Sequence, residues 1–350
     1  ESYIEYIKSL PINEGPDVFG LHDNANTSFA LAETDALLNT ALKLQPKSNN
    51  GGSGSAKGGG ATWDKLISSS ADDISSRLPP PFDVEKALLD FPTMYEESMN
   101  TVVTQELMRF NKLTAVIVKS LSEIKKAIAG LIVLGGELEA MGNSIAIGQV
   151  PRMWMDAAYP SLKPLGSWVL DLIARLNFLQ GWVDAMQKPK LYWISGFYFT
   201  QAFLTGTLQN FARKYQVPID EVAFDFAVLR PAEQEAAREV QPEDGAVIFG
   251  LFLDSARFDI NSHCLAEAQP RELFSSVPFI HMLPRRVKDL EPVKGTMELY
   301  TVDRSMPPYG VHEGTCHVYM CPVYKTSVRY GVLSTTGHST NFVIFYDDCS

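Results

Sequence analysis

The feature that most constrains the fold is a change of hydrophobic period near Pro218. Before it, apolar residues recur every three or four positions, most clearly at Leu107, Phe110, Leu113, Ile117, Leu121, Ile124, Ile128 and Leu131. This spacing predicts one long helix that buries one stripe. After it, short β-branched and aromatic runs at 245–254, 296–304, 315–326 and 341–348 are typical of an antiparallel sheet or small barrel. Because the helices come first and the strands follow, the sequence predicts an α+β fold.

Glycine and proline set the expected limits of the helices. We expect Gly135 and Gly136 to end the long helix, because glycine is favoured just after a helix C-terminus. A second helix is predicted over 167–187, with Ser167 as its N-cap and with Trp168, Leu172, Leu176 and Leu179 on one face. Prolines interrupt the segment between the two helices and exclude a continuous helix there, at Pro151, Pro160 and Pro164.

A Gly/Ser-rich segment separates the N-terminal region from the rest. Residues 48–61 read SNNGGSGSAKGGGA and offer nothing to bury, so we expect a flexible linker or a loop insertion. Upstream of it, 27–45 predicts an amphipathic helix that starts at a Thr27 or Ser28 cap and ends at Pro46. Its predicted apolar face holds Leu31, Leu38 and Leu42.

Composition excludes several classes of protein. The chain has 350 residues, 45% hydrophobic, which is typical of a folded protein of about two domains. Its net charge of −11 argues against nonspecific binding to nucleic acid or another acidic polymer. The apolar windows 113–136 and 191–206 are interrupted by charge or too short for a bilayer, and the N-terminus does not resemble a signal peptide. Four scattered cysteines suggest a reducing compartment without disulfides.

The linker gives only a weak indication of nucleotide binding. Residues 51–58, GGSGSAKG, partly follow the phosphate-binding pattern, which needs a glycine before the lysine and a hydroxyl after it. Ala56 and Gly58 occupy those two positions, and no strand precedes the segment. We therefore interpret it as an insertion.

Histidines and cysteines give few candidates for chemistry. His312, Cys316, His317 and Cys321 include the residue types of a zinc site, but in a strand Cys316 and Cys321 point to opposite faces unless Pro322 marks a bulge. The adjacent His263 and Cys264 are a poor catalytic pair, because such partners usually meet across a fold. We expect ordinary strand thiols, and we expect His281 and His338 to bond nearby backbone or hydroxyl groups.

His22 initially suggests a small active site, because Asp23 and Asn24 follow it directly. No cysteine or second histidine lies within twenty residues of it, so a turn in which Asp23 or Asn24 bonds local backbone is the better interpretation.

The aromatic run 192–206 could line an apolar pocket, but a place in the core or in an interface is favoured. The acidic stretch 231–245 is typical of a solvated loop or a short helix. The sequence predicts no catalytic, cofactor-binding or metal-ligating residue.

Five blocks in order resemble the C-terminal end of a dynein heavy chain. They are PDVFGLHDNA (16–25), YPSLKPLGSW (159–168), SGFYFTQAFLTGTLQNFARKY (195–215), GLFLDSARFD (250–259) and CPVYKTSVRYGVLSTTGHSTN (321–341). The last block is more similar to axonemal than to cytoplasmic dyneins. Within GLFLDSARFD, Ser255 and Phe258 stand where the family more usually has Gly and Trp, and the Gly-rich insertion is not an expected family feature.

The resemblance implies a domain layout. Residues 1–46 would be the end of the sixth AAA+ module, in its small helical lid, and 47–62 a Gly/Ser-rich insertion or linker. Residues 63–217 would be the helical part of the dynein C-terminal domain, and 218–350 its β-rich part, with a small antiparallel β-barrel.

The resemblance also implies a non-catalytic role. This segment would hold no nucleotide or cofactor, while ATP and Mg²⁺ would bind upstream modules of a parent protein that is an ATP-hydrolysing microtubule motor. The segment would brace the AAA+ ring and modulate ciliary or flagellar movement in the axoneme, a cytoskeletal structure of the cytoplasm. Expected partners are the upstream ring modules, light and intermediate chains and neighbouring dynein heads, with microtubules reached only through the parent protein and without nucleic acid or membrane.

On this hypothesis a helix face and the aromatic run 192–206 would pack against neighbouring ring modules, leaving apolar surface exposed on the isolated segment. Two other hypotheses remain open from the residues: a stand-alone α+β interaction or scaffold module, and a zinc-dependent module.

Overall fold

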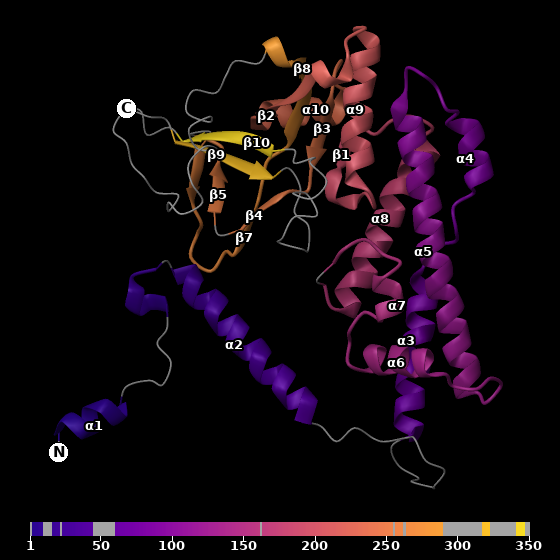
Figure 1. Ribbon diagram of the computed structural model, residues 1–350, viewed down its shortest axis with the longest axis vertical. Coiled ribbons are helices and arrows are strands. Elements are labelled where there is room, and N and C mark those ends of the chain that lie inside the picture. The colour runs from indigo at the N-terminus through magenta and orange to yellow at the C-terminus, as the bar shows by residue number, and fades with distance from the viewer. Residues whose placement is uncertain are drawn as a thin grey trace. The chain divides into compact units, whose positions relative to one another are not determined.

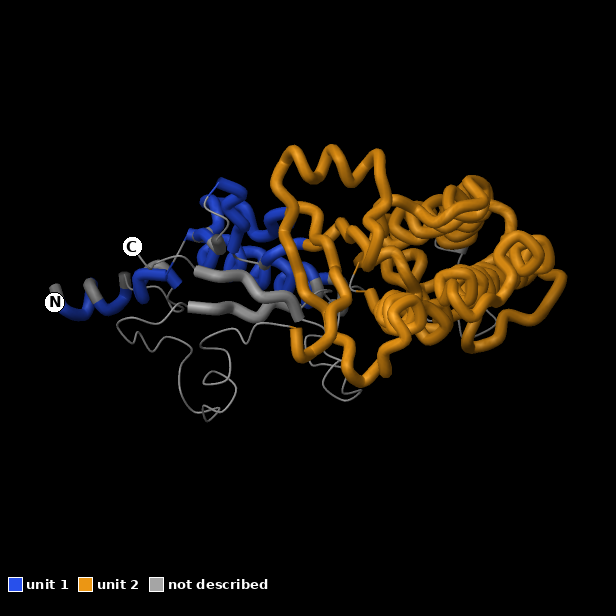
Figure 2. The backbone as a smooth tube through the Cα atoms, turned by 90° about the horizontal axis from the view of Figure 1, so that it is seen from above, with its two compact units in different colours: residues 1–54, 252–277 blue, residues 55–251, 278–350 orange. Residues whose placement is uncertain are grey.

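The computed structural model describes residues 2–9, 16–21, 23–44, 60–161, 163–254, 256–261, 264–289, 317–322 and 341–346. It divides the protein into two compact units, one formed by 1–54 with 252–277 and the other by 55–251 with 278–350 (Figure 2). The backbone therefore leaves the second unit after residue 251, contributes 26 residues to the first, and returns.

The second unit contains a helical bundle built around one long helix. Its helices are α3 (Gly60–Arg77), α4 (Val84–Asp90), α5 (Ser98–Ile128), α6 (Gly136–Ala146), α7 (Arg152–Met155), α8 (Leu165–Ala185), α9 (Thr200–Lys214) and α10 (Pro231–Glu239). Helices α3, α4 and α6 to α9 each contact α5 (Figure 1). The predicted stripe on α5 is confirmed from Leu107 to Ile124, where its residues are buried, but it is wrong at Leu131, which follows the helix and is 73% exposed. The acidic stretch 231–245 indeed begins with a short helix, α10.

The end of α5 is not where the sequence predicts it. The helix ends at Ile128, and Gly130 follows in the left-handed conformation with φ of 74°. The expected stop at Gly135–Gly136 is wrong, since Gly135 is instead the N-cap of α6. Two glycine signals lie close together here, and only the first coincides with the turn that satisfies the last carbonyls of α5.

The start of α8 also differs from the prediction. The helix begins at Leu165, so Ser167 lies inside the first turn and is not the N-cap. Pro164 takes the N-cap position with φ of −65° and extended ψ. A proline at this point fixes φ ahead of the first helical turn, and its side chain forms no cap hydrogen bond. The connection before α8 contains only the single turn α7, as its prolines predict.

Aromatic side chains fill the centre of the bundle. The predicted face of α8 is confirmed, with Trp168, Leu172, Leu176 and Leu179 buried. From the aromatic run, Tyr192, Phe197 and Phe203 are buried, and the rings of Phe197 and Phe203 stack with centroids 4.8 Å apart. The prediction of core is therefore confirmed. The expectation that this run packs on neighbouring modules is wrong for these rings, because helices of the same unit already bury them.

The second unit also holds a mixed four-stranded sheet. Its strands are β1 (Leu191–Trp193), β2 (Val222–Val228), β3 (Ala246–Phe249) and β8 (Ile280–Arg286), in the order β1-β3-β8-β2. Strand β1 runs parallel to β3, while β8 is antiparallel to both β3 and β2. Helix α9 packs on this sheet, where Ala212 and Val217 form a buried cluster with Val222. Short 3-10 turns occur at Ile194–Gly196, Ile219–Glu221 and Val287–Asp289.

The remaining strands form two-stranded ladders. Strand β9 (His317–Pro322) pairs with β10 (Asn341–Tyr346), which confirms strands within 315–326 and 341–348. The run 245–254 is split between β3 and β4 (Phe252–Asp254), and β4 pairs with β7 (Phe274–Ser276). Strand β5 (Ala256–Asp259) pairs with β6 (Cys264–Glu267). The predicted strand 296–304 lies outside the described residues.

The mixed α+β class is confirmed, but the small β-barrel is not. Across the described segments, the sheets have four or two strands and none closes on itself. Closure would need the edge strands β1 and β2 of the largest sheet to pair with each other or through further strands. No such pairing occurs between described residues.

The first unit begins with α1 (Ser2–Ser9), a 3-10 turn at Pro16–Phe19 and α2 (Asp23–Leu44). The predicted cap at Thr27 or Ser28 is wrong, because α2 starts at Asp23 and Thr27 Oγ1 donates to the Asp23 carbonyl one turn earlier, at 3.3 Å. Leu31 and Leu38 are exposed, and the side chain of Leu42 lies outside the described residues. None of the helices in the described segments combines the length and hydropathy needed to cross a bilayer.

Candidate functional site

A buried ionic cluster joins three parts of the second unit. Asp171 of α8 accepts hydrogen bonds from Arg175 Nε at 2.7 Å, Lys163 Nζ at 2.6 Å and the Tyr159 hydroxyl at 3.0 Å. The Arg175 side chain is only 11% exposed, whereas that of Lys163 is 52% exposed. Burial opposes the charged form of Asp171, but Arg175 and Lys163 outweigh it and hold the pKa of Asp171 below 3.8.

Arg175 extends the cluster into the aromatic core. Its guanidinium lies 3.8 Å from the ring centroid of Tyr159 and 5.5 Å from that of Trp193, and it donates to the Phe197 carbonyl at 3.3 Å. The guanidinium thus combines contacts to two rings with hydrogen bonds to Asp171 and the Phe197 carbonyl, a combination that suits arginine better than lysine. Burial also raises the pKa of the Tyr159 hydroxyl, so this group stays a proton donor to Asp171.

A second buried carboxylate fixes the entry into α9. Glu106 on α5 is fully buried and accepts hydrogen bonds from the backbone N–H groups of Tyr198 and Phe199, the latter at 3.1 Å, and from Arg109 at 3.1 Å. Burial raises the pKa of Glu106, and these donors offset part of that rise. The carboxylate therefore caps the N-terminus of a neighbouring helix, a role that locks α5 to α9.

Two glycines make room for Trp193 at the end of β1. A Cβ atom on Gly196 would lie 2.6 Å from Trp193 Cε3, and one on Gly250 would lie 2.5 Å from Trp193 Cδ1. Gly250 also has φ of 82°, a conformation that L-residues rarely adopt. The indole is thus held between two backbone segments that approach it too closely for any side chain.

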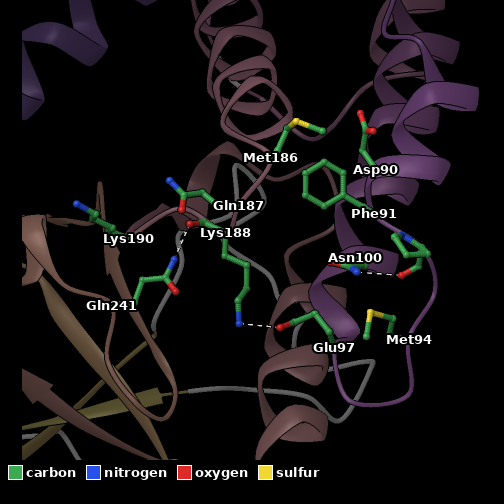
Figure 3. Close-up of a pocket in the computed structure, with 11 residues that line it drawn as sticks. Asp90, Phe91, Met94, Glu97, Asn100, Met186, Gln187, Lys188, Lys190 and Gln241 are labelled. Carbon is green, nitrogen blue, oxygen red and sulfur yellow. Dashed lines mark hydrogen bonds and ion pairs between the residues drawn. The ribbon is translucent and has the colours of Figure 1, made fainter.

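A cleft of about 610 Å³ lies in the second unit and is lined by both polar and apolar side chains (Figure 3). Lys188 Nζ points toward Glu97 and lies 2.7 Å from its Oε2, and Gln241 Nε2 donates to the Lys188 and Pro189 carbonyls. Asn100 Nδ2 donates to the Pro92 carbonyl at 2.9 Å. The exposed side chains of Met94 and Met186 also line the cleft. The lining residues that the structure describes include no Ser, Cys or His side chain.

The residues singled out from the sequence are not brought together. His22, His263, His312, Cys316 and His338 lie outside the described residues, as does the glycine-rich 45–59. His317 and Cys321 belong to β9, but their side chains are not described. His281 bonds a backbone group as expected, its Nε2 lying 3.0 Å from the Asp244 carbonyl oxygen. Within the described segments, no group of three His, Cys, Asp or Glu side chains is placed to hold a metal ion.

Asn24 has a role that the sequence does not predict. Its Nδ2 donates to the Gln269 and Glu272 carbonyls at 3.1 and 3.0 Å, and its Oδ1 accepts from the Arg271 N–H at 2.7 Å. The turn that Asn24 holds lies about 245 positions further along the sequence, while the local turn bond expected for Asp23 or Asn24 stays a prediction. Both segments belong to the first unit.

Sequence reasoning missed the buried carboxylates, although a signal was present. Asp171 and Arg175 are four residues apart within a helix whose neighbouring positions are apolar. This spacing places both side chains on the face that carries Trp168 and Leu172, where unpaired charges would be costly. A charge pair inside an apolar stripe could therefore have predicted the cluster.

The comparisons with known proteins identify the class. The family model for the C-terminal domain of the dynein heavy chain matches residues 31–347. The protein therefore belongs to the dynein heavy chain family, as the five sequence blocks predict.

The relatives are axonemal. The chain is 47% identical over 345 residues to dynein axonemal heavy chain 1 of Rattus norvegicus, covering 98% of this chain and 7% of the relative. It is 45% identical over 344 residues both to dynein axonemal heavy chain 3 of Homo sapiens and to dynein axonemal heavy chain 12 of Mus musculus, covering 98% of this chain and 8% and 10% of those relatives. The chain thus spans a tenth or less of the relatives that it matches.

Three of the family-like blocks meet in the structure. Block 159–168 supplies Tyr159 and Lys163 to the Asp171 cluster, and block 195–215 supplies Gly196 together with the Phe197 carbonyl. Block 250–259 begins with Gly250, which lies against Trp193. Residues of these three blocks, including Gly250 at the start of the third, therefore contribute to the polar and aromatic contacts of the second unit.

Proposed function

We propose that the protein is a non-catalytic C-terminal part of an axonemal dynein heavy chain. The observation that carries this proposal is the family match over 31–347 together with identity of 44–47% to axonemal heavy chains over 98% of the sequence. On this proposal the parent protein is an ATP-hydrolysing motor that moves on microtubules in the axoneme of a cilium or flagellum. ATP and Mg²⁺ bind its upstream modules.

The proposed layout follows the family. Residues 1–46 are the end of the sixth AAA+ module and its small helical lid, 47–62 are an insertion or linker, 63–217 are the helical part of the C-terminal domain and 218–350 its β-rich part. The exposed apolar residues of α1 and α2, including Tyr3, Ile7 and Leu37, support the lid assignment, because a helical lid normally buries such residues against the rest of its module.

We further propose that the segment braces the AAA+ ring mechanically. Two buried carboxylates, Asp171 and Glu106, cross-link α5, α8, α9 and the connection before α8. Satisfied polar networks of this kind make a core rigid and specific, which suits a part that transmits strain between modules. Its partners are the upstream ring modules of the same protein and, in the whole complex, light and intermediate chains and neighbouring heads.

The bracing role is tested by removing residues 71–350 from the full-length heavy chain. We expect altered gliding velocity, processivity or microtubule-stimulated ATPase rate, while nucleotide still binds the upstream modules. A matched control removes only the glycine-rich residues 48–61, which should leave all three quantities unchanged. Velocity, processivity and ATPase rate that stay at their normal values after removal of 71–350 would refute the proposal.

A further inference from the structure

Four consecutive apolar residues form an exposed turn between α5 and α6. Leu131, Ile132, Val133 and Leu134, here termed the apolar tip, are 73%, 39%, 91% and 39% exposed. Surface residues of this kind normally occur singly rather than in a run. The proposed function does not by itself explain why they lie here.

The apolar tip is held by ordered helix ends. At the end of α5, the Gly130 N–H donates to the Ala127 carbonyl at 3.0 Å and the Leu131 N–H donates to the Lys126 carbonyl at 2.9 Å. This is the Schellman arrangement, in which the residue after the glycine usually contacts an apolar residue of the last helical turn. Lys125 and Lys126 occupy the positions that such a contact would use, and Leu131 is 73% exposed.

The other end of the turn is equally well anchored. Helix α6 starts directly after Gly135, and its Met141 and Ile145 are buried, as is Ile124 near the end of α5. Because both flanking helices pack into the core, the apolar tip has a fixed place at the end of the α5–α6 pair (Figure 1). A fixed apolar turn is a pre-organised binding element, since little conformational freedom is lost when it is covered.

Charges around the apolar tip are mixed. Lys125 and Lys126 precede it in the last turn of α5, and Glu137 and Glu139 follow it in the first turn of α6. A surface that binds an anionic membrane carries an excess of basic residues beside its apolar residues. Two lysines balanced by two glutamates, in a protein of net charge −11, favour a protein groove with its own mixed rim instead.

We propose that the apolar tip docks into an apolar groove on the upstream part of the same heavy chain. This inference rests on the proposed function. The small size of the contact favours a partner within the same polypeptide. Four such side chains cover roughly 250–500 Å² of apolar area. A stable contact between separate proteins needs about 1,200–2,000 Å² in total. A tethered partner needs less area, because the second contact within one polypeptide forms at a high effective concentration.

The relatives supply the length of polypeptide that this requires. The present sequence covers 7% of dynein axonemal heavy chain 1 and 10% of heavy chain 12, so nine-tenths or more of such a heavy chain lies outside it. We place the groove that receives the apolar tip in that portion of the heavy chain.

The experiment places a photoreactive benzoylphenylalanine at Val133 of the full-length heavy chain. We expect irradiation to link position 133 to a single peptide upstream of the present residue 1, with a yield that does not change on tenfold dilution, because the contact is intramolecular. The matched control places the same probe at Val240, which is 69% exposed but lies outside the apolar tip. Peptide mass spectrometry identifies both products.

Several results would overturn the inference: no link above the background without irradiation, a link to another polypeptide or a second copy, or capture of the same upstream peptide with equal yield from Val240. Val133→Asp provides a second readout, with an expected several-fold rise in hydrogen exchange in the linked upstream peptide. Flotation with vesicles containing phosphatidylserine tests the lipid alternative, and binding that Val133→Asp abolishes would also overturn the inference.

The crosslinking result tests the docking of the apolar tip separately from the bracing role, which the removal of residues 71–350 tests. Altered motility on removal of 71–350 without a link from position 133 would refute the docking of the apolar tip alone. A link with unaltered motility would refute the bracing role alone.

Discussion

Replacing Asp171 by Asn tests the ionic cluster most directly. The change removes the charge that balances Arg175, whose side chain is only 11% exposed, while keeping nearly the same shape. Removing one partner of a buried ion pair typically costs about 3–5 kcal/mol. Arg175 keeps its bond to the Phe197 carbonyl and its place over the Tyr159 ring. We therefore expect the free energy of unfolding to fall by about 3 kcal/mol, at the lower end of that range.

Tryptophan fluorescence offers a selective assay. All five tryptophans lie between residues 63 and 193, within the second unit, so urea unfolding followed by fluorescence reports on that unit. Lys163→Met is the matched control, because the half-exposed Lys163 contributes at most about 1 kcal/mol. If Asp171→Asn lowers stability because it leaves the buried Arg175 cation without its carboxylate, then adding Arg175→Met should restore part of the free energy of unfolding.

The refuting results are specific. A loss of about 1 kcal/mol or less for Asp171→Asn, equal to that of Lys163→Met, would show that the cluster behaves like a surface ion pair. A further loss on adding Arg175→Met would show that Arg175 acts through packing rather than charge balance. An altered slope of free energy against urea would mean that the variant changes the extent of unfolding, and not only its free energy.

The same cluster sets a pH dependence. Arg175 and Lys163 hold the pKa of Asp171 below 3.8 in the folded protein, so the unfolded protein binds the proton more readily. The stabilisation is therefore present above about pH 5 and is lost as the pH falls through the folded-state pKa. We expect the difference between the parent protein and Asp171→Asn to narrow between about pH 5 and pH 3, and a constant difference would contradict this assignment.

Two further predictions concern the glycine positions and the Asn24 side chain. Gly250→Ala should cost about 2–4 kcal/mol, from overpacking against Trp193 and a left-handed φ, whereas Gly181→Ala, at an open position inside α8, should stabilise by about 0.5–1 kcal/mol. Urea unfolding followed by tryptophan fluorescence measures both, and equal effects would contradict the glycine argument. Asn24→Ala should destabilise the first unit by about 1–3 kcal/mol, because it removes the hydrogen bonds of Asn24 to the Arg271 N–H and to the Gln269 and Glu272 carbonyls, of which Gln269 keeps the Glu272 N–H as a donor. Peptide-level hydrogen exchange over 268–274 checks this, and unchanged protection there would be inconsistent with the Asn24 contacts.

Local patterns in the sequence determined the elements of this protein and their order. The stripe from Leu107 to Ile124 predicted α5, and the β-branched runs after Pro218 predicted β3, β9 and β10. Periodicity is a property of neighbouring residues, so it can be read without knowing the fold. The five family-like blocks predicted the dynein family for the same reason, since they need only order and residue identity.

Only the tertiary structure decided which turn residues act and which polar groups pair. Gly130 rather than Gly135 ends α5, and Pro164 rather than Ser167 precedes α8. Asn24 bonds a turn about 245 residues away, a contact that no local pattern encodes. The candidate site shows the same limit. The spacing of Asp171 and Arg175 could have indicated a pair, although it was missed, but Tyr159, Lys163 and the Phe197 carbonyl reach this pair only because folding brings the segments together. Partners in a buried polar network are chosen by burial and geometry, and both are created by folding.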